Sequence, residues 1–279
     1  MFNYIITIHN KQDLLSRVLE GIAACCSKHS KIIPVLDGCT DSSEFIVDEF
    51  TNHSGLNVEK VITPNIFEIR ALNAGIERVK SGFIMTIQDD VILQEPALEE
   101  KVERLFFDTD PTLGIISPRH GVNIRRMSLL PQFRKSGFIR LMDIYDRVCR
   151  PEEAWEQSVR VEYGQLIYRM AAGGSPMIIP ELVWKSIGSF DDALAPHMWH
   201  DIEYNLRSLR AGFKNAVYPL HFESKEEWGT MRQNSKTNPK WNSDLRRVSL
   251  RNMRYVWKKH GTAIAMYHSL QGRPSWMFL

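Results

Sequence analysis

The stretch FIMTIQDD at residues 83–90 decides the fold, because it joins an apolar run directly to three polar residues. Residues 83–87 are apolar apart from one threonine, which is typical of a short strand that is buried on both faces. Apolar residues spaced as one helix face over 69–79 predict a helix before this strand. Pro96 favours the start of a second helix after it. The stretch is therefore the strand of a helix–strand–helix unit.

The same alternation runs through the N-terminal half of the chain. Runs of apolar, β-branched and aromatic residues predict further strands, at residues 2–8, 31–36, 56–62 and 113–117. Apolar residues with helical spacing lie between them, at 14–22, 45–50, 69–79 and 98–106. Strands that alternate with helices favour an α/β fold with a doubly wound, mostly parallel sheet flanked by helices.

The second half of the chain departs from this alternation. Strand-like pieces are predicted at 159–163, 165–170 and 214–220, and helices at 181–187 and 199–211. The segment 241–261 is basic and helix-prone, and it predicts a C-terminal helical extension. No internal repeat or low-complexity linker divides the sequence, so we expect one domain over 1–225, followed by the extension 226–279.

Composition excludes several classes of protein. The 279 residues carry a net charge of +2 and are 43% hydrophobic, which excludes a disordered chain and gives no general footprint for nucleic acid. The 4 cysteines have no CxxC spacing, which argues against a disulfide scaffold or a zinc ribbon. No apolar run has the length of a membrane span, and no basic segment precedes an apolar one at the N-terminus. We therefore expect a cytoplasmic protein.

Polar side chains follow several of the predicted strands, at the sheet edge where open α/β folds bind ligands. Asp89 and Asp90 follow the buried strand directly, where desolvation opposes charge, and a divalent cation would satisfy them. Magnesium and manganese bind through one or two carboxylates and complete their shells with substrate phosphates, so a diphosphate ligand is expected. The alternative is that the two acids only cap the helix that starts near Pro96.

Residues 37–41 (DGCTD) follow the second predicted strand. One interpretation is structural, because Asp-Gly is a turn dipeptide and Asp41 or Ser42 is an ordinary helix N-cap. The other is functional: Asp37 would accept a hydrogen bond from a nucleobase N–H beside the sheet. These residues alone leave both interpretations open.

Several segments, taken in their order along the chain, resemble those of glycosyltransferase family 2, whose members have the GT-A fold and use nucleotide-sugar donors. The resemblance covers about residues 3–225. The similar segments are 4–11 (YIITIHNK), 37–41 (DGCTD), 70–76 (RALNAGI), 87–91 (IQDDV), Gly173-Gly174, 187–192 (IGSFDD), 200–207 (HDIEYNLR) and 211–213 (AGF). It implies a nucleotide-binding half at 1–117 and an acceptor and catalytic half at 118–225.

The resemblance implies roles on the donor side. Asp37 would contact the base, usually uracil, so a UDP-sugar is expected. Asp89 would touch the ribose, and Asp90 would hold manganese or magnesium, with His221 as a second metal ligand in the manner of some members. A lone His after a strand is otherwise an ordinary polar residue. The remaining residues expected at the nucleotide are Ile8, Asn10, Asn73 and Arg70, the last near the diphosphate or supporting that loop.

Asp201 occupies the position of the catalytic base in the resemblance. Inverting transfer needs one carboxylate, which takes the proton of an acceptor hydroxyl as its oxygen attacks the anomeric carbon. The structural alternative is that Asp201 only complements the dipole of the helix it opens, and Glu203 is the nearby competitor for the role of base. The acceptor or sugar would meet Gly173, Gly174, Trp199 and His200.

Two positions differ from the family pattern. Gln88 stands where many members have an acid, which leaves a Q-D-D run in place of D-x-D. His200 replaces the usual Glu before the base. Neither change removes the metal-binding acid or the base, so we expect an active enzyme.

Other functions and partners are weighed against this one. A sugar-1-phosphate nucleotidyltransferase would need a Gly-rich loop after the first strand, where residues 9–13 read HNKQD. A non-catalytic nucleotide- or carbohydrate-binding module is the alternative from another class. A glycan, a lipid-linked sugar or a protein could be the acceptor. The segment 241–261 could lie on an anionic membrane face, or it could present a solvated basic face while packed on the domain.

Overall fold

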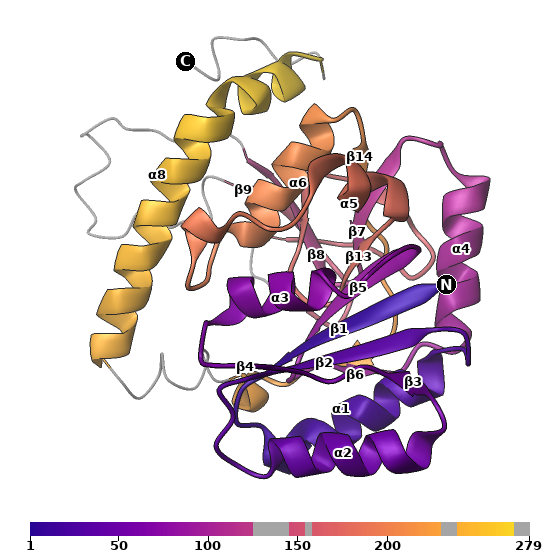
Figure 1. The fold of residues 1–279 in the computed structure, drawn as a ribbon. Helices are drawn as coiled ribbons and strands as arrows, with labels where there is room; N and C mark the ends of the chain where they lie inside the picture. Colours follow the sequence, from indigo (N-terminus) through magenta and orange to yellow (C-terminus); the bar gives the residue numbers. More distant parts are fainter. Residues whose placement is uncertain (125–144, 154–157, 230–238, 271–279) are drawn as a thin grey trace.

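The computed structural model describes residues 1–124, 145–153, 158–229 and 239–270 (Figure 1). Its centre is a sheet in the order β11-β14-β7-β13-β5-β1-β2-β3, with β4 also paired to β2. The bounds are β1 Phe2–Ile8, β2 Lys31–Asp37, β3 Asn57–Val58, β4 Val61–Thr63, β5 Phe83–Gln88, β7 Leu113–Ser117, β11 Ile167–Tyr168, β13 Met177–Ile179 and β14 Lys214–Val217. The fold is α/β with a mostly parallel sheet flanked by helices, as the sequence predicts.

Alternating residues of β1 divide the core into two layers. Tyr4 and Ile6 belong to one cluster of buried side chains, and Ile5 between them belongs to the other. The first layer is covered by α1 (Gln12–Cys25), α2 (Ser43–Ser54) and α4 (Leu98–Asp108). The second is covered by α3 (Glu68–Ile76), α5 (Glu181–Ile187), α6 (His200–Arg210) and the long α8 (Pro239–Leu270).

Two smaller sheets lie at the carboxyl-end side of the main sheet. One has the order β10-β9-β8-β12, and the other pairs β15 with β6. Their bounds are β8 His120–Ile124, β9 Tyr145–Cys149, β10 Val159–Arg160, β12 Ala171–Gly173, β6 Ile92–Leu93 and β15 Phe222–Glu223. β12 pairs with β8 in antiparallel register, and Gly173 lies opposite His120. This register brings two segments of the predicted acceptor half together.

The structure corrects several predicted elements. The antiparallel β13 lies between β5 and β7, where the sequence predicts no strand. The strand predicted over 56–62 is split into β3 and β4. The strands predicted over 159–163 and 165–170 are shorter than expected, since β10 and β11 have two residues each. α4 begins at Leu98 instead of Pro96. The sequence could not show β13, because three apolar residues after a turn carry no periodicity.

The predicted C-terminal extension is a helix that packs on the domain. α8 lies beside α6 (Figure 1), and it buries Val256 and Ile264 in the second core layer. Its basic residues Arg246, Arg247, Arg254 and Lys258 are exposed. Within the described ranges no helix has the length and apolar character needed to cross a membrane. Parts of the predicted acceptor half (125–144 and 154–157) and of the extension (230–238 and 271–279) lie outside the described residues.

Candidate functional site

A cavity of ≈ 340 Å³ opens beside the carboxyl end of β5, between β12 and the N-terminus of α6. β5 contributes Gln88 and β12 contributes Gly173 to its wall. Gly174 lines it too, and the other polar or aromatic residues of its wall are Thr7, Glu68, Thr86, His120, Arg147, Ser175, Phe190, Trp199, His200, Asp201 and Ser249. Four of the residues predicted for the acceptor and the base therefore share one cavity with Asp201: Gly173, Gly174, Trp199 and His200.

Asp201 presents its carboxylate at the start of α6, where the first N–H groups of a helix have no partner within the helix. Its Oδ1 accepts a hydrogen bond from the N–H of Ile202 at 2.8 Å, and its Oδ2 accepts one from the N–H of Gly174 at 3.2 Å. The two bonds come from different elements, so they fix the carboxylate between α6 and the turn after β12. Both oxygens keep lone pairs that can face the cavity.

Gly173 makes room for this carboxylate. A Cβ added at Gly173 would lie 2.7 Å from Oδ2 of Asp201 and 3.2 Å from Nε2 of His120. Gly174 follows with φ +79, a left-handed conformation that glycine adopts without steric cost. The Gly-Gly pair thus lets Asp201 approach the backbone of β12 and turns the next N–H toward it.

Asn205, one turn after Asp201, joins α6 to the same strand. Its Nδ2 donates to the carbonyl of Ala172 at 2.9 Å and to the carbonyl of Asp201 at 2.8 Å. Its Oδ1 accepts from the N–H of Ala172 at 2.9 Å. Because Asn205 is fully buried, these bonds are shielded from water and hold the first turn of α6 against β12.

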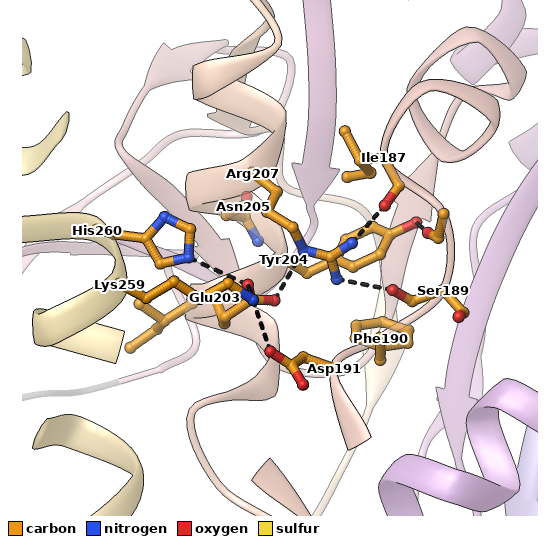
Figure 2. A network of polar contacts seen from close by, with 12 residues as sticks. Ile187, Ser189, Phe190, Asp191, Glu203, Tyr204, Asn205, Arg207, Lys259 and His260 are labelled. Atoms are coloured by element: carbon orange, nitrogen blue, oxygen red, sulfur yellow. Dashed lines mark hydrogen bonds and ion pairs between the residues drawn. The ribbon is translucent and has the colours of Figure 1, made fainter. Parts of the chain in front are cut away.

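Glu203, the competitor for the role of base, points away from the cavity. It is fully buried, and its carboxylate meets Nε of Arg207 at 2.9 Å, Nζ of Lys259 at 2.8 Å and Nε2 of His260 at 3.1 Å (Figure 2). Burial raises the pKa of Glu203, but the hydrogen bond from His260 and the charge of Arg207 outweigh it, so the pKa is lowered. Glu203 therefore links α6 to α8 and is not available as a base.

Arg207 and Lys259 extend this network to the loop before α6. Arg207 donates to the carbonyls of Ile187 and of Ser189, the latter at 2.7 Å (Figure 2). Lys259 donates to Asp191 at 2.6 Å. Burial raises the pKa of Asp191, but bonds from Lys259 and from other donors outweigh it and lower the pKa to about 2. The predicted family segment at 187–192 is thus fastened to α6 and α8.

His120 and Arg147 belong to the cavity, although the sequence did not single them out as site residues. His120 lies at the start of β8, opposite Gly173. Burial, together with the charges of Arg147 and Arg119, lowers the pKa of His120 to about 3, although the charge of Asp201 opposes this. His120 is therefore neutral at pH 7. Its position three residues after a predicted strand was a usable signal, since Asp37 and Asp89 follow strands in the same way.

On the donor side, Asp37 holds the turn between β4 and α3. It is 4% exposed, and its Oδ1 accepts from the N–H of Ile66 at 2.7 Å and from Oγ1 of Thr63 at 3.0 Å.

Asp41 lies just before α2, as the structural interpretation of residues 37–41 expects. Its carboxylate accepts a hydrogen bond from the N–H of Ser43 at 3.0 Å. The second residue it contacts is Gln12, whose N–H donates at 2.9 Å.

Asp89 and Asp90 follow β5 as predicted. Oδ2 of Asp89 accepts from the N–H of His9 at 3.0 Å, and Nζ of Lys11 lies 3.6 Å from Oδ1. Burial raises the pKa of Asp89 to about 6, although the charge of Lys11 opposes this. Asp90 is 7% exposed. Two adjacent acids and a lysine thus gather where the ends of β1 and β5 meet.

The other predicted donor residues occupy varied positions. Ile8 is fully buried at the end of β1. Asn10 has φ 52, and its Oδ1 accepts from the N–H of Thr40 at 2.7 Å, which joins the loops after β1 and β2. The amide of Asn73 is bonded to the backbone of Phe190 and to Asp192, so it ties α3 to the loop before α6. Arg70 is exposed on α3.

The metal that the family resemblance implies can be tested against these residues. Among the described residues, no three His, Cys, Asp or Glu side chains come together as a metal cage. His221 is exposed and stacks on Tyr163, with ring centroids 4.0 Å apart. Neighbouring carboxylates at a strand end nevertheless fit magnesium or manganese, which take one or two carboxylates and complete their shells with substrate phosphates. Asp89 and Asp90 therefore fit a metal that a diphosphate helps to hold.

A model of the glycosyltransferase-like family 2 matches residues 2–273 of the sequence. The chain belongs to this family. Curated relatives match over shorter stretches. A teichoic acid poly(glycerol phosphate) polymerase of Staphylococcus epidermidis is 28% identical over 130 residues, which are 46% of this chain and 17% of that protein. An undecaprenyl-phosphate 4-deoxy-4-formamido-L-arabinose transferase of Edwardsiella ictaluri is 33% identical over 116 residues, 40% of this chain and 34% of that one. The matched stretches thus span only a minor part of these relatives.

Solved structures of glycosyltransferases share the GT-A fold of this family 2 member. S. aureus TarS in complex with UDP aligns with a TM-score of 0.52 and 14% identity, over 77% of this chain and 57% of that chain. The mannosyltransferase PcManGT from Pyrobaculum calidifontis, in complex with GDP-Man and Mn²⁺, aligns with a TM-score of 0.51 and 12% identity, over 96% of this chain and 75% of that chain. At these identities the likeness establishes the fold.

Proposed function

We propose that the chain is an inverting glycosyltransferase, which moves a sugar from a nucleoside-diphosphate sugar to an acceptor hydroxyl with Asp201 as the general base. One observation carries the proposal: Asp201 lies in the cavity beside the carboxyl end of β5, and Glu203 is buried in ion pairs elsewhere. Inversion in one displacement needs a single carboxylate opposite the leaving group. We assign this role to Asp201, which shares the cavity with Glu68 of α3.

The donor would bind along the ends of β1, β2 and β5. Asp37 would face the base, with Ile8 and Asn10 beside the nucleotide, and Asp89 would meet the ribose. Arg70 and Asn73 remain proposals as donor residues, on α3. A UDP-sugar is the proposed donor; neighbours of the same fold were solved with UDP or with GDP-Man.

A divalent metal fits the donor end of the site. Asp90 would hold Mn²⁺ or Mg²⁺, with His221 as a second ligand, and the metal would offset the charge that develops on the departing nucleoside diphosphate. Lys11, next to Asp89, adds a positive charge at the same place. The Mn²⁺ in the PcManGT complex supports this assignment.

The residues around Asp201 would prepare it for proton transfer. The N–H groups of Ile202 and Gly174 hold the two carboxylate oxygens, so the base keeps one orientation before the acceptor arrives. An acceptor hydroxyl bound among Gly173, Trp199 and His200 would donate its proton to the carboxylate as its oxygen attacks the anomeric carbon. Holding the reacting groups in this geometry supplies much of the rate enhancement.

For the acceptor we propose a lipid-linked substrate at a membrane face, in preference to a free glycan or a protein. The name of one relative contains undecaprenyl-phosphate, and the other is a teichoic acid polymerase. The exposed Arg246, Arg247, Arg254 and Lys258 of α8 would contact anionic lipid headgroups. The proposed membrane contact would be supported if the protein sediments with phosphatidylglycerol vesicles at low salt and does not sediment with neutral vesicles.

The experiment that tests the proposed function is the stereochemistry of the product. The protein is incubated with UDP-N-acetylglucosamine, UDP-glucose or GDP-mannose and Mn²⁺, and the released or transferred sugar is followed by proton NMR. We expect the first-formed anomer to have the opposite configuration to the donor. A retained configuration would contradict the single-displacement mechanism, and no consumption of any nucleotide sugar would favour a binding module.

Metal dependence is a separate prediction. Excess EDTA should abolish donor turnover, and Asp90→Ala should lower donor affinity by more than about tenfold, because the diphosphate loses the cation that neutralises it. Calorimetric titration of UDP with and without Mn²⁺ measures the effect. The control is Asp48→Ala on α2, whose carboxylate pairs with Lys60 just before β4, and it should change UDP affinity little. Full turnover in EDTA would contradict the metal assignment.

A further inference from the structure

The loop that leads into α6 holds an unfavourable backbone conformation immediately before Asp201. Met198 has φ 74 and Trp199 has φ 70, so two consecutive residues with side chains lie in the left-handed region. Such residues are uncommon there and keep this conformation only where their surroundings impose it. Trp199 is the N-cap of α6, and its carbonyl accepts the N–H of Glu203 at 2.9 Å. The direction in which α6 begins therefore depends on how this loop is held.

Asn252 of α8 holds the loop through its backbone. Its side chain is fully buried, and Nδ2 donates to the carbonyls of Leu194 at 2.7 Å, His197 at 2.9 Å and Met198 at 2.9 Å. The two N–H groups of this amide thus serve three carbonyls that span the loop, so one N–H is shared between two of them. The carbonyl oxygen of the amide is bonded as well, because Nε of Arg251 donates to it at 2.8 Å. This fixes which end of the amide faces the loop.

A second contact from the same face of α8 reaches the cavity itself. Ser249 precedes Asn252 by one helical turn, and its Oγ accepts a hydrogen bond from Nε1 of Trp199 at 3.0 Å. Both Ser249 and Trp199 line the cavity that contains Asp201. α8 therefore fixes the backbone of the loop through Asn252 and its aromatic side chain through Ser249.

We infer that Asn252 is a positioning residue for the catalytic base, which it serves by holding the strained loop 194–199 from which the Asp201 turn of α6 begins. The inference rests on the proposed function, since it takes Asp201 as the base. Asn252 itself does not line the cavity and touches no reacting atom. Its loss should slow the chemical step and leave donor binding unchanged, because the donor residues lie on other elements.

The test compares two changes in the same helix of the full chain. Asn252→Leu removes the amide donors at similar size, whereas Val256→Ala, one turn later, removes buried apolar contacts of α8 without touching the loop. Each variant is assayed with UDP-N-acetylglucosamine, UDP-glucose and GDP-mannose in the presence of Mn²⁺ for kcat and KM. Hydrogen exchange of residues 194–201 is measured in parallel and needs no activity. Ser249→Ala is a milder variant in case Asn252→Leu does not fold.

We expect Asn252→Leu to lower kcat by about 10- to 100-fold, since small misplacements of a catalytic group cost this much, with donor KM within about twofold of the parent. Amide exchange over 194–201 should accelerate. Val256→Ala should lower the melting temperature but keep kcat and the exchange of this loop near the parent values. Ser249→Ala should lower kcat several-fold, again with KM retained.

Equal losses of kcat in Asn252→Leu and Val256→Ala would overturn the inference, because they would indicate general destabilisation. A rise in donor KM that parallels the loss of kcat would overturn it too, as would unchanged exchange over 194–201. Failure of the proposed function would look different. In that case Asp201→Asn would keep the parent turnover, while the exchange of the loop would still report whether Asn252 holds it.

Discussion

The donor half and the catalytic half of the molecule build their loops in different ways. In the donor half, polar contacts join residues at the ends of neighbouring strands, such as Asp37 with Thr63 and Asn10 with Thr40. In the catalytic half and α8, the polar side chains that join one element to another are fully buried. Examples are Asn205 with Ala172, Glu203 with His260 and Asn252 with Met198.

This difference predicts that the two halves respond differently when a polar side chain is substituted. The donor loops end strands of an apolar core that forms without them, so a changed polar contact there should act locally. In the catalytic half the polar contacts themselves set the position of α6 against β12 and α8. A buried network of this kind specifies one geometry when every member is satisfied, and it is costly when one member is lost.

The largest effect on stability is expected for Glu203→Gln. The change removes the buried negative charge that faces Arg207 and Lys259. These two cations are partly exposed and keep Ser189 and Asp191 as partners, so we expect a cost of about 1.5–3 kcal/mol, which is typical of hydrogen bonds to a charged group. Urea unfolding at pH 7 measures the change in the free energy of unfolding. The matched change in the donor half is Glu44→Gln, which breaks the exposed pair with Lys60 and should cost less than about 1 kcal/mol. Equal effects would remove the contrast between the halves.

The next prediction concerns activity, and the substitution adds a single methyl group. Gly173→Ala places a Cβ 2.7 Å from Oδ2 of Asp201, so the carboxylate must move. We expect turnover to fall about 100-fold, with the affinity for UDP and Mn²⁺ retained. Steady-state kinetics and calorimetry measure the two quantities. Gly55→Ala is the control: its φ is +65, but an added Cβ would meet nothing within 4 Å, so it should lower stability slightly without changing turnover. Normal turnover in Gly173→Ala would show that Asp201 need not stay in place.

A smaller effect follows from the pKa of His120, which burial lowers to about 3 in the folded protein. The unfolded chain binds a proton below about pH 6.5, so it holds more protons than the folded state between about pH 6.5 and pH 3. Stability is therefore lost as the pH falls through this window, by about 2 kcal/mol between pH 7 and pH 5. In His120→Gln, the free energy of unfolding should depend less on pH. Urea unfolding at pH 7 and pH 5 tests this, and an equal loss of stability in the variant and the parent would contradict it.

Much of the fold followed from the sequence because the strands of the donor half are continuous apolar runs. β1 at Phe2–Ile8 has the predicted bounds, and the acids after β5 lie at its carboxyl end as expected. The insertion of β13 between β5 and β7 was missed, since a three-residue antiparallel strand has no sequence signal of its own.

The candidate site was predicted in part. Gly173, Gly174, Trp199, His200 and Asp201 share one cavity, and their roles stay predictions. His120 and Asn252 were missed for a physical reason. Their importance comes from strand register and from helix packing over long sequence distances, which a linear pattern does not reveal.

The most direct test of the account is the rate of sugar transfer by Asp201→Asn. The amide keeps the size of the side chain but cannot take the proton of the acceptor hydroxyl. We predict that kcat falls by about 100- to 10,000-fold while the affinity for UDP and Mn²⁺ stays within about twofold of the parent. A variant that transfers sugar at the parent rate would contradict the central claim that Asp201 is the base.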